Sequence, residues 1–160
     1  MHERNDIAVR QATIFDLDLA APLFDAYRQF YRKPGDLDLA RRFLLERFQH
    51  NESIIFLAVE PDGSAVGFTQ LFPSFSSVSA ARILILNDLF VQPEARRKRV
   101  GSLLLAAAAR FGRSIGAVRL TLSTEVTNKS AQALYEREGW TRQTDFYVYD
   151  LALEPQMPRR

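Results

Sequence analysis

The apolar positions in the first half of the chain follow two periods, that of a helix and that of a strand. They predict a strand at Ile7–Ile14, helices at Asp16–Tyr31 and Asp36–Phe48, and strands at Ile54–Val59 and Val66–Phe72. Asp16 is placed to cap the first helix, and Pro34-Gly35 ends it. The sequence Pro61-Asp62-Gly63-Ser64 is a turn signal, so we expect the last two strands to form an antiparallel hairpin.

The second half contains an uninterrupted apolar run, Ile83–Leu86, which is typical of a central strand covered on both faces. The hydroxyl-rich stretch Pro73–Ser79 before it is expected to be a loop. The elements predicted after it are a helix from Val100 to about Arg113, a strand at Ala117–Ser123, a helix from Asn128 to Gly139, and strands that include Phe146–Tyr149. A helix between two strands implies a right-handed crossover and a parallel pair. The expected fold is α+β, with a mixed, mostly antiparallel twisted sheet and about four flanking helices.

A basic loop joins the central strand to the helix that follows it. The strand ends at Asn87–Val91, and the chain continues through Gln92-Pro93-Glu94-Ala95 into Arg96-Arg97-Lys98-Arg99-Val100-Gly101. The first N–H groups of a helix have no intrahelical partner, and the helix dipole adds partial positive charge beside them. Cations at this end oppose the dipole unless an anion compensates. The order of residues therefore predicts a phosphate-binding loop, with a solvated helix start as the alternative.

Two motifs together carry a resemblance to a known family. Arg96-x-x-Arg99-x-Gly101 follows a Val-x-Pro strand end, and Asn128-x-x-Ala131-x-x-Leu134-Tyr135-x-x-x-Gly139-Trp140 lies downstream. In this order they resemble the GNAT superfamily of acyl-CoA-dependent N-acetyltransferases, nearest to its small polyamine and protein-amine acetyltransferases. The resemblance implies the GNAT fold, whose sheet is splayed in the middle.

One position departs from the family's cofactor signature, Gln/Arg-x-x-Gly-x-Gly/Ala. Arg96 and Gly101 fit its first and last positions, but Arg99 stands where the first glycine is expected. A side chain costs little there if Arg99 is already helical, because only a positive φ or a steric contact would require glycine. We therefore expect cofactor binding to survive.

The resemblance implies acetyl-CoA as the cofactor, without a metal. The strand end would pair with the pantetheine arm through its backbone, and the basic loop would hold the pyrophosphate. The cofactor-binding residues implied in this way are Leu89, Phe90, Val91, Arg96, Arg97, Lys98, Arg99, Val100, Gly101, Ser102, Asn128, Ala131 and Tyr135. Asn128 has an alternative role as the N-cap of its helix, which needs no ligand.

Acetylation of an amine requires two proton transfers. An amine with a pKa of about 10.4 is mostly protonated at neutral pH, so its lone pair must first be uncovered by a base. The departing thiolate of coenzyme A then benefits from a proton. The resemblance implies Tyr135 as this general acid, and the alternative is a tyrosine that only packs beside Leu134 and Trp140.

The base is less clear from the residues. Similar polyamine-type acetyltransferases have Glu-Asp where this chain has Asn87-Asp88. On a regular strand these two side chains point to opposite faces, so only one would face the acceptor. Asp88 is expected to act as base or amine anchor, or else to be held by N–H donors or an arginine such as Arg82. Glu125 is the reserve candidate.

Substrate-binding residues are expected on the first helix, the loop before the central strand and the central strand itself. Tyr27, Tyr31 and Phe75 would offer an aromatic surface to an amine, although aromatics at helical spacing are also typical of a core. Asn87 completes the predicted substrate-binding set of Tyr31, Phe75 and Asn87. The amine itself stays open among a small molecule, a polyamine, and a lysine or N-terminal amine.

Composition excludes several other classes of protein. The 160 residues suit one domain, expected at 1–153 with a loose tail at 154–160. The chain has no cysteine, which excludes thiol catalysis and cysteine metal sites, and its two widely separated histidines argue against zinc. A net charge of only +2 gives no reason to expect a nucleic acid partner. The sequence shows neither a membrane-length apolar run nor a signal peptide, so a cytoplasmic location without membrane partners is expected.

The sequence therefore predicts an acetyl-CoA-dependent N-acetyltransferase that acts on a primary amine by direct attack in a ternary complex. The alternative is a non-catalytic, acyl-CoA-binding regulatory module with the same fold. Dimers are common among similar proteins, so the choice between a monomer and a homodimer is left open.

Overall fold

The computed structural model describes residues 6–155, so most of the expected tail at 154–160 lies outside it. Its centre is a five-stranded sheet in the order β1-β2-β3-β4-β5. The strands are β1 (Ala8–Gln11), β2 (Ile54–Val59), β3 (Ala65–Ser76), β4 (Ala81–Val91) and β5 (Leu120–Thr121). Neighbours from β1 to β4 are antiparallel, whereas β4 and β5 are parallel. The expected mixed, mostly antiparallel sheet is confirmed.

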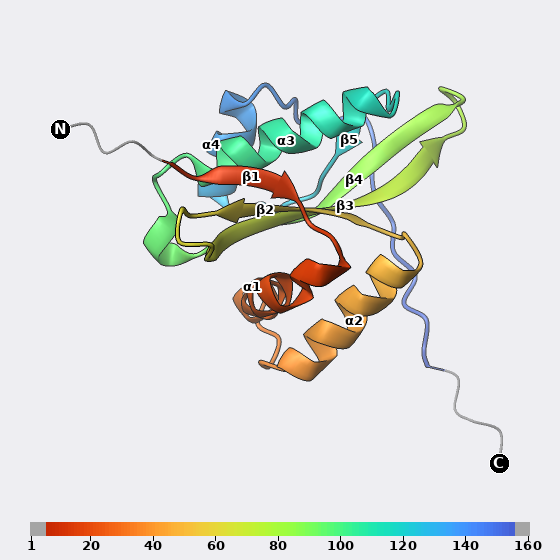
Figure 1. Cartoon of the computed structure of the whole chain (residues 1–160). Helices are drawn as coiled ribbons and strands as arrows, with labels where there is room; N and C mark the ends of the chain where they lie inside the picture. The colour runs from red at the N-terminus through yellow and green to blue at the C-terminus, as the bar shows by residue number, and fades with distance from the viewer. Residues whose placement is uncertain (1–5, 156–160) are drawn as a thin grey trace, which may run out of the picture.

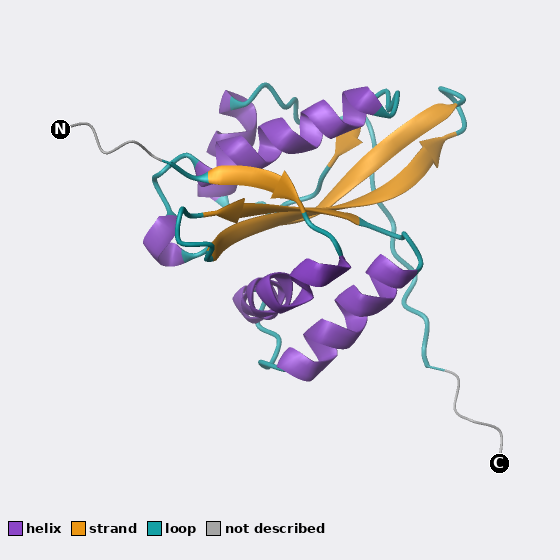
Figure 2. Ribbon diagram, in the orientation of Figure 1, coloured by secondary structure: helices purple, strands orange, loops and turns teal. Residues whose placement is uncertain are grey.

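Helices cover both faces of this sheet. They are α1 (Leu17–Phe30), α2 (Leu37–Gln49), α3 (Val100–Ser114) and α4 (Lys129–Arg137), with short 3₁₀ turns η1 (Ile14–Asp16) and η2 (Pro93–Ala95). Figure 2 shows α1 and α2 on one face and α3 with α4 on the other. The four α-helices confirm the predicted α+β class, and each begins within a few residues of its predicted start.

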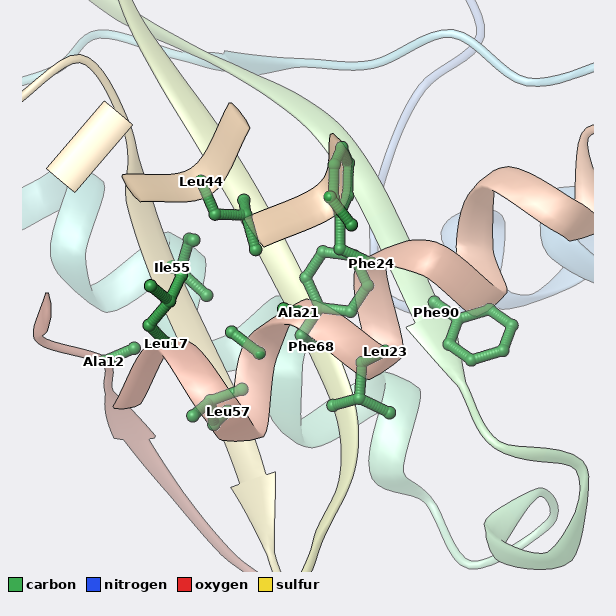
Figure 3. Close-up of a cluster of buried hydrophobic side chains, with 12 residues drawn as sticks. Ala12, Leu17, Ala21, Leu23, Phe24, Leu44, Ile55, Leu57, Phe68 and Phe90 are labelled. Carbon is green, nitrogen blue, oxygen red and sulfur yellow. The ribbon is translucent and has the colours of Figure 1, made fainter. Parts of the chain in front are cut away.

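Two hydrophobic clusters join the helices to the sheet. Beneath α1 and α2, the side chains of Phe24 and Leu44 pack with Phe68 and Phe90 from the sheet, as Figure 3 shows. Beneath α3, a second cluster includes Leu84 and further buried residues of the sheet and helix. Burial on both faces explains the uninterrupted apolar run of the central strand, since neither face is exposed to water.

The hairpin that leads into β4 is longer than predicted. The expected loop at Pro73–Ser79 is partly wrong, because β3 continues to Ser76 and pairs with the start of β4. These residues form an arm that projects beyond β2, whose pairing ends at Leu71 (Figure 1). The polar side chains of the arm are compatible with a strand because little of the core covers it.

The C-terminal part of the sheet is shorter than predicted. The strand expected at Ala117–Ser123 is reduced to Leu120–Thr121, and the strands expected around Phe146–Tyr149 are absent from the described chain. A strand exists only where a neighbour completes its hydrogen bonds, and the segment near Tyr149 has no such neighbour among residues 6–155. The apolar pattern around Phe146–Tyr149 is therefore not enough to predict a strand there.

Candidate active site

An extra residue in β4 changes which face of the sheet its side chains occupy. Consecutive residues of β3 pair with Asp88 and Leu86, so Asn87 between them forms a bulge. Before the bulge, Leu84 and Leu86 belong to the cluster beneath α3, whereas after it Phe90 belongs to the cluster beneath α1 and α2. The alternation has shifted by one residue at Asn87. Asp88, two residues before Phe90, therefore lies on the α1 side.

The side chains of Asn87 and Asp88 are in contact, contrary to the expectation for a regular strand. Nδ2 of Asn87 donates a hydrogen bond of 2.7 Å to Oδ1 of Asp88. The prediction that the two side chains point to opposite faces is wrong because it assumed unbroken alternation, which the bulge interrupts.

Asp88 is a buried carboxyl held by two amides. Its exposed fraction is 1%, and Nε2 of Gln70 donates to its Oδ2 at 2.6 Å. Burial raises the pKa of Asp88 above its ordinary value, while the hydrogen bonds from Asn87 and Gln70 oppose that rise. Arg82 does not hold the carboxyl, since its guanidinium lies 5.2 Å from the centre of the Phe75 ring.

Two tyrosines of α1 and its C-terminal end lie beside this carboxyl. The hydroxyl of Tyr27 donates to the backbone oxygen of Asn87 at 3.1 Å, which ties α1 to the bulge. The rings of Tyr27 and Tyr31 are 5.0 Å apart. Burial raises the pKa of Tyr27, and the charge of Asp88 adds to the rise. Burial also raises the pKa of Tyr31, with smaller effects from the charges of Glu125 and Asp88. The hydrogen bond and the ring contact place Tyr27 and Tyr31 beside the bulge that precedes Asp88.

Tyr135, on α4, packs against the hydrophobic cluster beneath α3. Its ring packs 6.0 Å from that of Trp140, and the backbone N–H of Trp140 donates to its carbonyl at 2.9 Å. Burial raises the pKa of Tyr135 to about 12, with a smaller effect from Tyr31. The phenol therefore keeps its proton at neutral pH. Both predicted roles of Tyr135, packing against Trp140 and facing the site, are compatible with this position.

The basic loop has an unusual backbone. Arg97 and Arg99 have φ angles of 65° and 61°, in the left-handed region that favours glycine. The expectation that Arg99 tolerates its position by being helical is wrong, because it is the left-handed residue just before α3. Such a residue costs about 1–2 kcal/mol. All four cations of the loop are exposed, and Nε of Arg96 donates to the backbone oxygen of Val91 at 3.1 Å.

The start of α3 packs closely against α4 and is hydrogen-bonded to it. A Cβ on Gly101 would lie 3.0 Å from Cδ2 of Leu134, so the absence of a side chain permits close packing of the two helices. Nearby, the hydroxyl of Ser102 donates to Oε1 of Glu138 at 2.6 Å. Val100 is buried in the core beneath α3, which leaves only its backbone for a ligand.

Asn128 occupies the N-cap position of α4. Its Oδ1 accepts a hydrogen bond of 3.1 Å from the backbone N–H of Ala131. This confirms the capping alternative, while a contact of Asn128 or Ala131 with a cofactor stays a prediction.

The sheet is splayed beyond the middle of β4. Only Leu84 and Ile85 of β4 pair with β5. Within residues 6–155, the stretch Leu89–Val91 therefore pairs with β3 on one side and with no strand on the other. That edge can pair with a ligand that binds like a strand, except at the backbone oxygen of Val91, which already accepts from Nε of Arg96.

Phe75 is the predicted site residue that the structure does not bring to this neighbourhood. It lies on the hairpin arm opposite Arg82, with 67% of its surface exposed. Arg82 precedes Asp88 by six positions on β4, which corresponds to roughly 20 Å of strand. Phe75 is therefore separated from Tyr31 and Tyr135.

Gln70 is a site residue that sequence reasoning missed. A signal was present, because Thr69 and Gln70 interrupt an otherwise apolar strand, and both are fully buried. Buried polar side chains require partners, and here Thr69 donates to the backbone oxygen of Asp88 at 2.8 Å. Two polar residues in an apolar strand thus indicated a polar partner across the sheet.

Residues 6–155 contain no helix long and apolar enough to cross a membrane. The same residues contain no cluster of three or more histidine, cysteine or acidic side chains that could bind a metal ion.

Comparisons with known proteins agree on one family. The model of the Acetyltransferase (GNAT) family matches residues 20–140. An uncharacterized N-acetyltransferase of Bacillus subtilis, YhfO, is 50% identical over 143 residues, which cover 89% of this chain and 95% of the relative.

Solved structures give the same result. The crystal structure of a probable acetyltransferase superimposes with a TM-score of 0.87 at 42% identity, covering 93% of this chain and 99% of the other. AAC(6')-Iy in complex with the bisubstrate analogue CoA-S-monomethyl-acetylneamine shares the fold, with a TM-score of 0.75 at 23% identity, covering 92% and 99% of the two chains. The sequence match over most of the chain and the shared fold together show that the protein belongs to the GNAT family of acetyltransferases.

Proposed function

We propose that the protein transfers the acetyl group of acetyl-CoA to a primary amine of a small molecule. The amine would attack the thioester directly, in a complex of the protein, acetyl-CoA and the amine. The observation that carries the proposal is the buried carboxyl of Asp88 beside the free edge of β4, with Tyr27 bonded to the bulge next to it and Tyr31 packed on Tyr27. A carboxyl, protonated phenols and an unpaired strand edge are the groups that acyl transfer to an amine requires.

The residues present fit acetyl-CoA. The left-handed angles of Arg97 and Arg99 alternate with other conformations, an arrangement that turns successive N–H groups toward an anion. Their side chains and the N-terminus of α3, a helix of 15 residues, add positive charge for a pyrophosphate. The edge Leu89–Val91 would pair with the amide groups of the pantetheine arm. When bound, acetyl-CoA supplies an activated acetyl group as a thioester.

Asp88 is proposed to receive the proton that the amine must lose. Its raised pKa brings it closer to the working pH, where a carboxylate is a more effective base. Because only 1% of Asp88 is exposed, the proton would pass through one intervening water. Tyr27 holds the bulge in place, and Asn87 donates to the carboxylate. Glu125, whose charge acts on Tyr31, is proposed to attract the cationic amine.

Tyr135 is proposed to give its proton to the departing thiolate. Its pKa of about 12 means that the phenol is protonated when the reaction begins. Packing against Trp140 and the cap at Asn128 would hold its hydroxyl in position. A small acceptor is favoured over a protein because the carboxyl of Asp88 is only 1% exposed.

Thermal unfolding with acetyl-CoA tests cofactor binding. A ligand at about 100 times its Kd adds about 2.7 kcal/mol, or roughly 5–10 °C, to the native state of a chain of this size. Plain coenzyme A should give a shift of similar size, because the proposed contacts lie on the pyrophosphate and pantetheine. The absence of a shift at millimolar ligand would contradict the proposal.

An amine panel tests the reaction and its acceptor. We expect free thiol to appear with polyamines, aminoglycosides or other small primary amines, and to appear more slowly with lysine-containing peptides. Faster turnover with peptides would contradict the acceptor class. Cofactor binding without turnover of any amine would instead favour a non-catalytic acyl-CoA-binding module.

A further inference from the structure

A row of aromatic rings runs from the core beneath α1 to the surface at the end of that helix. The ring of Tyr27 lies 5.9 Å from that of buried Phe68, and the ring of Tyr31 lies 5.0 Å from that of Tyr27. Phe30 continues the row, with its ring 5.3 Å from that of Tyr31 and nearly at right angles to it. The exposed fractions are 38% for Tyr31 and 56% for Phe30, so the row ends in two rings that face water.

The inner part of the row lies beside the proposed base. The hydroxyl of Tyr27 donates to the backbone oxygen of Asn87, the residue just before Asp88 in the bulge. Tyr31 is the next ring outward from Tyr27, and Phe30 is the ring after it. A ligand whose amine approaches Asp88 can therefore extend outward across Tyr31 to Phe30.

The stability of the helix does not explain an aromatic residue at the outer end of the row. Phe30 is the last residue of α1. At a helix position that faces water, alanine, lysine and glutamate have a lower free energy than phenylalanine. A single exposed apolar residue is ordinary, but the ring of Phe30 also contacts a row of rings that leads to the candidate site. This continuity with the site indicates a ligand of the site as the partner of Phe30.

The charges at this end of α1 favour an uncharged partner over a second cation. Arg32 and Lys33 follow Tyr31 directly in the chain, and both are exposed. The carboxylate of Asp25 already accepts from the backbone N–H of Asp36, and that of Asp36 accepts from the first turn of α2. A second ammonium group would be repelled by the two cations, whereas a hydrocarbon would not be. An amine with one positive charge therefore fits this surface better than a polyamine does.

We propose that the acceptor is a monoamine with an apolar body, an alkyl chain or an aromatic ring, which lies on Tyr31 and Phe30 while its amine reaches Asp88. Phe30 then determines specificity and takes no part in the reaction itself. The single ammonium group is the one that Glu125 attracts. This inference rests on the proposed acetyl transfer, and it narrows the acceptor from small primary amines in general to apolar ones.

The unbranched alkylamines from propylamine to hexylamine test the apolar body, because the basicity of the amine hardly changes along this series. We expect kcat/KM to rise about two- to fourfold for each added methylene, as each one is removed from water by the rings. Phe30→Ala should remove most of this rise through KM, with little change in kcat, and Phe30→Leu should restore part of it. Phe15→Ala is the matched control, because Phe15 is 94% exposed and lies before the start of α1, so the rise should be unchanged.

Titration calorimetry measures binding of the amine without turnover. Hexylamine is titrated into the protein saturated with coenzyme A. We expect its Kd to be about tenfold higher in Phe30→Ala than in the unmodified protein, and unchanged in Phe15→Ala.

Three results would overturn this inference and leave the proposed acetyl transfer standing. They are turnover that does not increase with chain length, faster turnover of diaminobutane than of pentylamine, which has the same length, and an equal Kd of hexylamine in Phe30→Ala and the unmodified protein. Acetylation of no amine would contradict the proposed function, and the calorimetric titration would then decide the apolar surface by itself.

Discussion

The side-chain amide of Gln70 donates a hydrogen bond of 2.6 Å to Oδ2 of Asp88, and its own carbonyl oxygen is buried without a partner among the described residues. The donated bond favours the charged carboxylate, whereas burial disfavours it more strongly. If the amide of Gln70 rotated by half a turn, its oxygen would accept a hydrogen bond from the O–H of neutral Asp88 instead. Gln70 can therefore keep a hydrogen bond to Asp88 whether the carboxyl is charged or neutral.

Replacing Asp88 by asparagine should abolish most of the proposed base function while retaining the shape of the side chain. We expect kcat/KM to fall by about 10²–10⁴-fold, the usual contribution of a general base. The thermal shift caused by acetyl-CoA should be unchanged, because Asp88 is not assigned to the cofactor. Steady-state kinetics with the best amine of the panel provides the measurement, and a loss of less than tenfold would remove Asp88 from the mechanism.

The same variant should change how stability depends on pH. Because the pKa of Asp88 is raised by folding, the native state holds this proton more tightly than the unfolded chain does. The free energy of unfolding of the unmodified protein should therefore fall as pH rises from the ordinary aspartate range to the raised pKa. Asp88→Asn lacks this decrease, so its stability relative to the unmodified protein should increase with pH. Urea unfolding at a series of pH values measures the difference, and parallel curves would argue against a raised pKa.

Gln70→Met removes the donated hydrogen bond but keeps a side chain of similar volume. Loss of a bond that favours the carboxylate should raise the pKa of Asp88 further. The acidic limb of the pH profile of kcat/KM should then move to higher pH. Thr69→Val is the matched control, because it deletes a buried hydrogen bond to the backbone of Asp88 and leaves the carboxyl untouched. Equal shifts in both variants would mean that Gln70 acts only through stability.

Tyr135→Phe tests the proposed acid. The ring keeps its packing on Trp140, so folding and cofactor affinity should be retained. Without the hydroxyl, kcat should fall by about 10²-fold or more, with little change in KM for acetyl-CoA. Tyr149→Phe, which removes a hydroxyl from an exposed tyrosine, serves as the control and should leave kcat unchanged. A full rate in Tyr135→Phe would assign Tyr135 to packing alone.

Arg99→Gly should stabilise the protein. Glycine removes the cost of about 1–2 kcal/mol for a left-handed residue, offset by the roughly 0.5–1 kcal/mol of extra freedom that glycine brings to the unfolded chain. A net gain of about 0.5–1 kcal/mol corresponds to a melting temperature higher by roughly 1–4 °C. Arg96→Gly is the contrasting control, since φ at Arg96 is −67° and glycine brings no relief there. Calorimetry that finds Arg99→Gly less stable than the unmodified protein would contradict the argument.

The sequence predicted the elements that are local and missed the features that depend on neighbours. The helix predicted at Asp36–Phe48 and the hairpin around Gly63 follow from residues close together in the chain, and both are present. The bulge at Asn87 could not be predicted, because it is defined by the pairing of β4 with another strand. The same limit applies to Gln70, whose partner lies 18 positions away in the sequence.

The basic loop and the C-terminal segment show two further limits of prediction from the sequence. The motif identified the position of Arg99, but not the left-handed backbone that it adopts there. The apolar pattern around Tyr149 predicted a strand, but the described chain forms none there and the side chain of Tyr149 is exposed. Sequence patterns describe what a segment requires, whereas the rest of the structure decides whether that requirement is met.

The bulge at Asn87 joins two parts of β4 whose side chains keep their faces whatever residue occupies the bulge. Any residue that fits there leaves Leu86 and Phe90 in their present clusters. Deleting Asn87 would restore regular alternation with Asp88 still on the α1 side, but it would remove the amide that donates to the carboxylate and the carbonyl that accepts from Tyr27. Divergence of this acetyltransferase toward new amines is therefore expected to change the groups around the carboxyl of Asp88 and not the face of the sheet on which that carboxyl lies.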